Sequence, residues 1–158
     1  MEIKQIAIIR VRGDLKKSQE VRDTLQMLKL FKKNSCVVVK NTDGYVGMLK
    51  KVKDVVTWGE IDKETFNLLL MKRGKLAGGK FVDENYMKEK LNSNFDKFTD
   101  DFFELKKTLK DIPGLKQFFR LKPPNKGFDK NGIKKPFSMG GALGYRKEKI
   151  NDLIRRML

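Results

Sequence analysis

Over the first 60 residues, apolar and polar positions follow an order that predicts a β-α-β-α-β unit. Dense runs of β-branched and other apolar residues, typical of well-buried strands, occur at residues 3–12, 35–40 and 55–60. Between them, apolar residues recur every three or four positions, which predicts amphipathic helices from Ser18 to about Leu30 and over residues 45–54. Two helices that cover one face of a small sheet are the simplest packing for such a unit.

The second half of the chain predicts helices joined by irregular segments. The expected helices cover residues 63–73, 83–91, 99–111 and 148–158. In the third of them, Asp100 and Asp101 fall in the first turn, where the helix dipole favours acidic side chains. The last has an apolar stripe at helical spacing, made by Ile150, Leu153, Ile154 and Met157.

The segment 120–147, RLKPPNKGFDKNGIKKPFSMGGALGYRK, interrupts this pattern. It holds three of the four prolines and five of the 13 glycines, with eight Lys or Arg and one acid, Asp129. Its apolar residues are few and scattered, so we expect it to need a partner to pack against. The chain therefore divides into a β-α-β-α-β core at 1–60, a helical elaboration at 61–117, and a basic loop with a final helix at 118–158.

Charge indicates the kind of partner. The chain has 36 Lys and Arg against 20 Asp and Glu, a formal net charge of +16. The excess is +6 in residues 1–60 (13 basic, 7 acidic), +2 in 61–117 (12 and 10) and +8 in 118–158 (11 and 3). Self-repulsion of this size destabilises a compact state, so we expect a polyanionic partner. Nucleic acid is favoured over a membrane, because no apolar run approaches the roughly 20 residues that span a bilayer.

Catalytic and metal chemistry has little support in the sequence. Histidine is absent and Cys36 is the single cysteine, which excludes Ser-His-Asp and Cys-His catalysis and argues against zinc. The segment GFDKNGIK has glycines spaced as in a phosphate-binding loop, but Ile133 stands where that loop requires Lys. Paired acids lie at turns and helix starts, where capping is the simpler role than general acid-base catalysis: Glu60/Asp62, Asp83/Glu84 and Asp100/Asp101. Cys36 is expected to be a buried structural thiol in a reducing, cytosolic compartment.

Basic residues mixed with glycine, proline and aromatics in the 120–147 segment suit an irregular phosphate path better than a DNA groove. Phe128, Phe137 and Tyr145 either stack on an unpaired base or anchor the loop to the core, and anchoring is the favoured role. No zinc-finger, RRM or KH signature appears in the sequence. Structured RNA, recognised by its shape and backbone, is therefore the expected partner.

Several segments resemble one protein family. The runs IAIIRVRG and GYVGMLKKVKDVV (residues 44–56) resemble large-subunit ribosomal protein L-thirty, called L-seven in eukaryotes. KRGKLAGGK, GLKQFFRLKPP and GGALGYRKEKINDLIRRML are similar to the longer archaeal and eukaryotic members, and the last of these to the archaeal form. The chain departs from the family pattern at Pro124–Gly127 and at Lys147.

The resemblance implies an α+β, ferredoxin-like fold: a three-stranded antiparallel sheet in the order 3-1-2 with two helices on one face. It also implies a structural place in the large (50S) subunit of a cytoplasmic ribosome, on large-subunit rRNA near the 5S rRNA and beside other ribosomal proteins. It implies no catalysis and no cofactor, and we accordingly expect no small-molecule substrate and no membrane partner. Two alternatives remain open: an RNA- or nucleotide-processing enzyme with a Lys or carboxylate site, and a regulator that binds RNA transiently.

Fifteen basic residues are the candidate contacts to RNA phosphates. Those from the core are Arg10, Arg12, Lys32, Lys33, Lys50, Lys51 and Lys53. Those from the later segments are Arg73, Lys75, Lys122, Lys126, Lys134, Lys135, Arg146 and Lys147.

Overall fold

The computed structural model describes residues 2–13 and 15–158. Its α-helices are α1 (Gln19–Met27), α2 (Asp43–Val52), α3 (Lys63–Arg73), α4 (Glu84–Leu91), α5 (Phe95–Phe103) and α6 (Ile150–Met157). Its strands are β1 (Gln5–Arg10), β2 (Ser35–Lys40), β3 (Val56–Glu60), β4 (Phe119–Arg120) and β5 (Gly144–Tyr145). Short 3-10 turns occur at η1 (Leu109–Asp111), η2 (Phe137–Met139) and η3 (Lys147–Lys149).

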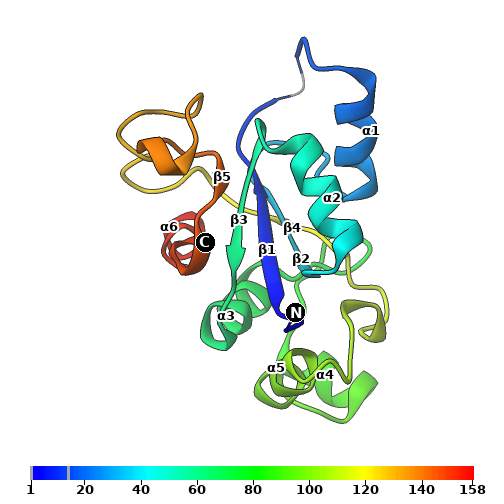
Figure 1. Cartoon of the computed structure of the whole chain (residues 1–158). Helices are drawn as coiled ribbons and strands as arrows, with labels where there is room; N and C mark the ends of the chain where they lie inside the picture. Colours follow the sequence, from blue (N-terminus) through cyan, green and yellow to red (C-terminus); the bar gives the residue numbers. More distant parts are fainter. Residues whose placement is uncertain (1, 14) are drawn as a thin grey trace.

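The strands form one sheet in the order β4-β2-β1-β3-β5 (Figure 1). β1 is central and antiparallel to both neighbours, with Ala7 opposite Val38 on β2 and opposite Gly59 on β3. The expected strand order 3-1-2 is therefore confirmed for the three central strands of the sheet. The expected number of three strands is too small, because β4 adds to β2 and β5 adds to β3. Strands of two residues are too short to leave an alternating signal in the sequence.

Both faces of the central strands are buried, each against its own set of helices. Successive side chains of a strand point to opposite faces. Ile6 and Ile8 therefore join Leu25 of α1, Leu28 at its C-cap and Leu49 of α2 in one apolar cluster. On the other face, Ala7, Ile9, Cys36 and Val38 join a second cluster with side chains from α3, α5 and α6. Figure 1 shows α1 and α2 together on one side of the sheet and α3 and α6 on the other.

Most helix boundaries follow from capping. Ser18 accepts a hydrogen bond from the Val21 N–H (3.4 Å), which confirms it as the N-cap of α1.

The expected apolar stripe of α6 is also confirmed, since Ile150, Leu153, Ile154 and Met157 are all buried.

The predicted helix at 99–111 is wrong. Asn94 caps the Lys97 N–H at 2.8 Å and so starts α5 at Phe95. Leu105 then has a φ of 65°, a left-handed conformation that a helix cannot continue. Asp100 and Asp101 consequently lie toward the end of α5, where they pair with lysines instead of serving the helix dipole.

One glycine lets two layers approach closely. A Cβ on Gly59 of β3 would overlap the carbonyl oxygen of Lys147 and would lie 3.1 Å from Cβ of Ile150. The absence of a side chain at this position allows η3 and α6 to pack directly on β3. Gly47, on the exposed side of α2, has nothing within 4 Å of the same position.

We expect Gly59→Ala to lower the free energy of unfolding by about 1–3 kcal/mol, because backbone must move to relieve the overlap. Gly47→Ala is the matched control and should raise it by about 0.5–1 kcal/mol, since alanine is the better helix former. Urea denaturation of both variants measures the difference. Equal stability of the two would show that β3 and α6 are not packed as described.

Candidate nucleic-acid interface

The 120–147 segment folds around a buried arginine. Arg146 donates from Nε to Thr57 Oγ1 (2.8 Å) and from Nη2 to Asp129 Oδ2 (2.9 Å) and the Ala142 carbonyl (2.8 Å). Its guanidinium also lies 4.9 Å from the centre of the Phe137 ring. Burial lowers the pKa of Arg146, and the Asp129 carboxylate opposes that shift. A guanidinium with these partners stays charged and joins the loop to β3.

The loop also has a small apolar cluster of its own. Ala142 and Leu143 pack with Val11, and Phe128 lies against them. Leu121 is buried in the main core, and Asn131 bridges the loop by donating to the Met139 carbonyl (2.6 Å). The expectation that this segment needs an external partner for packing is therefore too strong, because its scattered apolar residues find partners within the chain.

The three aromatic residues of the loop have different environments. Phe128 packs against both apolar clusters that border the loop, and Phe137 lies beneath the cations of Arg146 and Lys149. Tyr145 is 44% exposed, with its ring centre 6.3 Å from that of Trp58. Its hydroxyl donates to Glu60, and burial together with this bond raises its pKa to about 12. Anchoring thus describes Phe128 and Phe137, while Tyr145 presents part of its ring to solvent.

The candidate phosphate contacts differ in exposure. Exposed side chains are Lys32, Lys33, Lys50, Lys51, Lys53, Lys122, Lys126, Lys134, Lys135 and Lys147. Half-buried ones are Arg12, Arg73 and Lys75. Arg10 and Arg146 are buried, at 4% and 3% exposure. Arg10 donates to the backbone carbonyls of Leu30 (2.8 Å) and Arg12 (3.0 Å), so these two arginines hold the fold together instead of facing a ligand.

A basic groove brings together residues far apart in the sequence. Arg73 is the last residue of α3 and Lys75 follows it, while Lys116 precedes β4 and Arg120 lies in it. Together with Gly79 and Phe118, these four residues line a cavity of about 290 Å³. The loop after α3 turns through Gly78 and Gly79, both with positive φ. It is held against the segment before β4 by bonds from the Lys116 N–H to the Lys75 carbonyl (2.9 Å) and from the Ala77 N–H to the Gly114 carbonyl (2.9 Å).

The groove has the electrostatics of an anion site. No carboxylate is among its lining residues, and none of its four cations forms an ion pair within the described chain. The Nε atom of Arg73 is buried without a hydrogen-bond partner there. Four cations with an aromatic ring beside them can bind phosphates and an adjoining base. Lys116 and Arg120 are not among the sequence candidates. The acid-free run LKQFFRLK around them is the signal that could have identified them.

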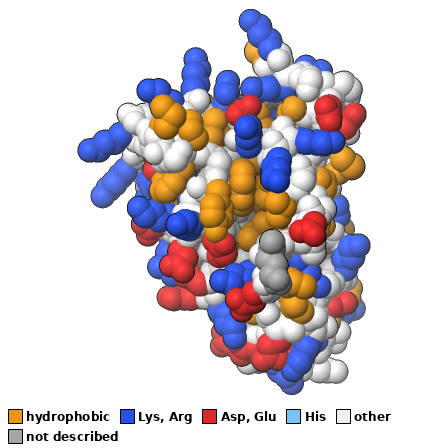
Figure 2. All heavy atoms as spheres, in the orientation of Figure 1, with side chains coloured by type: hydrophobic (Ala, Val, Ile, Leu, Met, Phe, Trp, Pro, Cys, Tyr) orange, Lys and Arg blue, Asp and Glu red, His pale blue; other side chains and the backbone are white. Residues whose placement is uncertain are grey.

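Charge is unevenly placed over the surface. In the face shown in Figure 2, Lys and Arg side chains project around the carboxy-terminal loop, and Asp and Glu gather in the lower half, over α3 to α5. Within the described residues, no group of three or more His, Cys, Asp or Glu is placed to hold a metal ion. Cys36 is fully buried, as expected, and desolvation raises its pKa. None of the described helices has the length and apolar content needed to cross a membrane.

Comparison with known proteins gives consistent matches. The family model of ribosomal protein L30p/L7e matches residues 6–56. Large ribosomal subunit protein uL30 of Methanococcus vannielii is 49% identical over 152 residues, which are 96% of this chain and 98% of that protein. The uL30 proteins of Methanopyrus kandleri and Nanoarchaeum equitans are 46% and 47% identical, over 94% and 96% of this chain and 100% and 97% of their own lengths.

We expect Arg146→Gln to lower the free energy of unfolding by about 3 kcal/mol or more, because it leaves the Asp129 carboxylate and two buried acceptors without their donor. Lys147→Gln, one residue away and exposed, should change it by less than about 0.5 kcal/mol. Urea denaturation monitored by tryptophan fluorescence compares the two. If both variants unfold like the parent chain, Arg146 is not the residue that joins the loop to β3.

Proposed function

Because this chain belongs to the family of ribosomal proteins L30p/L7e, we propose that it is a structural component of the large ribosomal subunit that binds ribosomal RNA through its basic surface. The observation that carries this function is its similarity to archaeal uL30 proteins over nearly the full length of both chains. The protein is accordingly not an enzyme, and its place is on the cytoplasmic ribosome. Its partners are ribosomal RNA and neighbouring ribosomal proteins.

The physical properties of the chain support RNA as the partner. A net charge of +16 opposes close packing of the free protein, and phosphate neutralises it. Recognition through phosphate is favoured by cations that project into solvent, and most strongly by those that lack carboxylate partners. Most candidate lysines are exposed. Within the described residues, Lys51 is the exception that has a carboxylate partner, because it forms an ion pair with Glu20 (2.8 Å). This distribution supports binding by shape and charge, the mode by which proteins recognise folded RNA.

The proposed contact surface combines the groove with the exposed candidates. Arg73, Lys75, Lys116 and Arg120 provide a concave part, and Lys134 and Lys135 project from the carboxy-terminal loop. Arg10 and Arg146 are left out because their guanidinium groups are engaged inside the protein. The other contributors are Arg12, Lys32, Lys33, Lys50, Lys51, Lys53, Lys122, Lys126 and Lys147.

A finer placement, near the 5S rRNA, rests on the family resemblance alone and forms part of the proposal. Chemical footprinting of large subunits with and without the chain tests it. Protection of nucleotides in or beside the 5S rRNA is the expected result, and protection confined to a distant part of the subunit would contradict it.

Sedimentation tests the function itself. In gradients at low salt, we expect the native protein to travel with the large subunit. At high salt it should be released, because counterions compete for the phosphates. A protein that remains in the free pool under all conditions would contradict the proposal.

The groove makes a specific prediction about salt. For binding to a ribosomal RNA fragment, Lys116→Gln with Arg120→Gln should reduce the slope of log K against log salt by about 2, because two phosphates are no longer neutralised by the protein. Lys88→Gln with Lys90→Gln removes the same charge from the exposed side of α4 and should leave the slope unchanged. Fluorescence anisotropy at several salt concentrations measures both. Equal slopes for the two double variants would remove the groove from the RNA surface without affecting the assignment to the subunit.

A further inference from the structure

β2 has an edge that the sheet leaves open. β4 pairs only with Ser35 and Cys36, so the remaining part of β2, Val37–Lys40, has no strand beside it on that side within the described chain. The chain preceding β4 turns away toward the loop after α3, where the Lys116 N–H bonds to the Lys75 carbonyl. An unpaired edge in the middle of a sheet is a ready template for another strand.

The orientation of the backbone identifies which groups are free. In an antiparallel pair, the residues of one strand face alternately toward and away from the partner strand. The Asn41 N–H donates to the Lys4 carbonyl (3.0 Å), which places residue 41, and hence Val37 and Val39, toward β1. Val38 and Lys40 therefore direct their N–H and C=O groups to the open edge. Among the residues that the structure describes, these groups make no hydrogen bond on that side.

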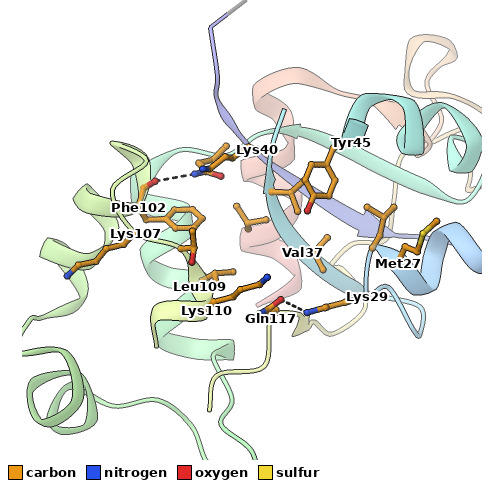
Figure 3. A pocket seen from close by; sticks show the side chains of 15 residues that line it. Met27, Lys29, Val37, Lys40, Tyr45, Phe102, Lys107, Leu109, Lys110 and Gln117 are labelled. Atoms are coloured by element: carbon orange, nitrogen blue, oxygen red, sulfur yellow. Dashed lines mark hydrogen bonds between the residues drawn. The ribbon is translucent and has the colours of Figure 1, made fainter. Parts of the chain in front are cut away.

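A groove of about 290 Å³ lies along this edge. Figure 3 shows Met27 and Tyr45 on one side of β2 and Phe102, Leu109 and Lys110 on the other. Gln117, hydrogen-bonded to Lys29, closes one end. Because the groove straddles the edge, a strand placed in it would direct alternate side chains to Tyr45 on one face and to Phe102 and Leu109 on the other.

The rim of the groove is basic. Lys29, Lys40, Lys107 and Lys110 line it, and no carboxylate does. Lys107 is paired with Asp101 (3.3 Å), and Lys29 donates to Gln117. Lys40 and Lys110 form no ion pair within the part of the chain that the structure describes. Acidic side chains on an incoming segment would complement these two lysines.

We propose that the open edge of β2 binds a short extended peptide segment of another ribosomal protein, with both apolar and acidic residues, as an additional strand opposite Val38–Lys40. This rests on the proposed function, because assembly of the subunit brings the partner to the edge. A peptide is favoured over RNA because Val38 and Lys40 offer both donors and acceptors to the groove. Phosphate oxygens only accept, and the apolar floor gives them nothing to bind.

Photocrosslinking in purified large subunits tests the proposal. A p-benzoylphenylalanine replaces Met27, an exposed side chain on the rim. We expect an adduct that resists ribonuclease, is removed by protease, and contains a peptide with acidic and apolar residues by mass spectrometry. Adding Lys40→Pro should reduce its yield about tenfold, because proline removes the outward N–H and its ring obstructs the new strand. Lys40→Arg keeps both the N–H and the positive charge and should retain most of the adduct.

Four outcomes would overturn the proposal: a ribonuclease-sensitive adduct, an adduct with a second copy of this chain, equal yields with Lys40→Pro and Lys40→Arg, or no adduct at all. Every variant is first sedimented with the large subunit. A variant that fails to co-sediment bears on the proposed function or on assembly, and a variant that co-sediments without the expected adduct bears on the edge alone.

Hydrogen exchange gives a second measurement that needs no substitution at Lys40. In the free protein, the Val38 amide should exchange faster than the amides of Val37 and Val39, which face β1. In the assembled subunit, an added strand should slow exchange at Val38 at least tenfold. An unchanged exchange rate of the Val38 amide after assembly would contradict strand addition, whatever the result of the crosslinking experiment.

Discussion

The structure depends on the burial of both faces of its three central strands. Every residue of β1 is buried, and neighbouring side chains alternate between the two apolar clusters. The helices α1 and α2 can cover only one face. Without α3, α5 and α6, the side chains of Ala7, Ile9, Cys36 and Val38 would be exposed to water, at a cost of about 25 cal/mol for each Å² of apolar surface. The residues beyond 60 therefore complete the core as well as extending it.

Because helices cover both faces of the sheet, its edges and the outer loops are the parts that can bind ligands. The lateral strands β4 and β5 are two residues long, and each is placed by a segment that carries basic residues. β4 joins the groove of Arg73, Lys75, Lys116 and Arg120 to the sheet. β5 joins the carboxy-terminal loop to β3, and the residues that follow β5 pack on β3 over Gly59. Because β4 begins opposite Cys36 and does not extend along Val37, the same arrangement that positions the RNA surface also leaves the β2 edge open.

The sequence predicts those features that depend on local patterns. Dense apolar strands, helical stripes and the Ser18 cap are encoded by residues a few positions apart, and the structure confirms them. The groove could not be predicted, because Arg73 and Lys116 meet only through backbone bonds between distant segments. Charge alone also fails to distinguish Arg10 and Arg146 from exposed lysines, since burial is decided by neighbours that only the fold brings together. The predicted bounds of the helix at 99–111 are wrong for local reasons: the N-cap at Asn94 and the left-handed conformation of Leu105.

The cations of this chain fall into two classes with different sensitivity to salt. Arg10 and Arg146 are buried and donate several hydrogen bonds at once, mostly to backbone carbonyls, a geometry that a guanidinium provides and an ammonium does not. Lysines predominate among the exposed cations, where each acts as a mobile point charge. Salt screens exposed charges far more than buried ones. Ionic strength should therefore release the protein from RNA well before it disturbs the fold, which allows one chain to carry a net charge of +16 and still keep a defined core.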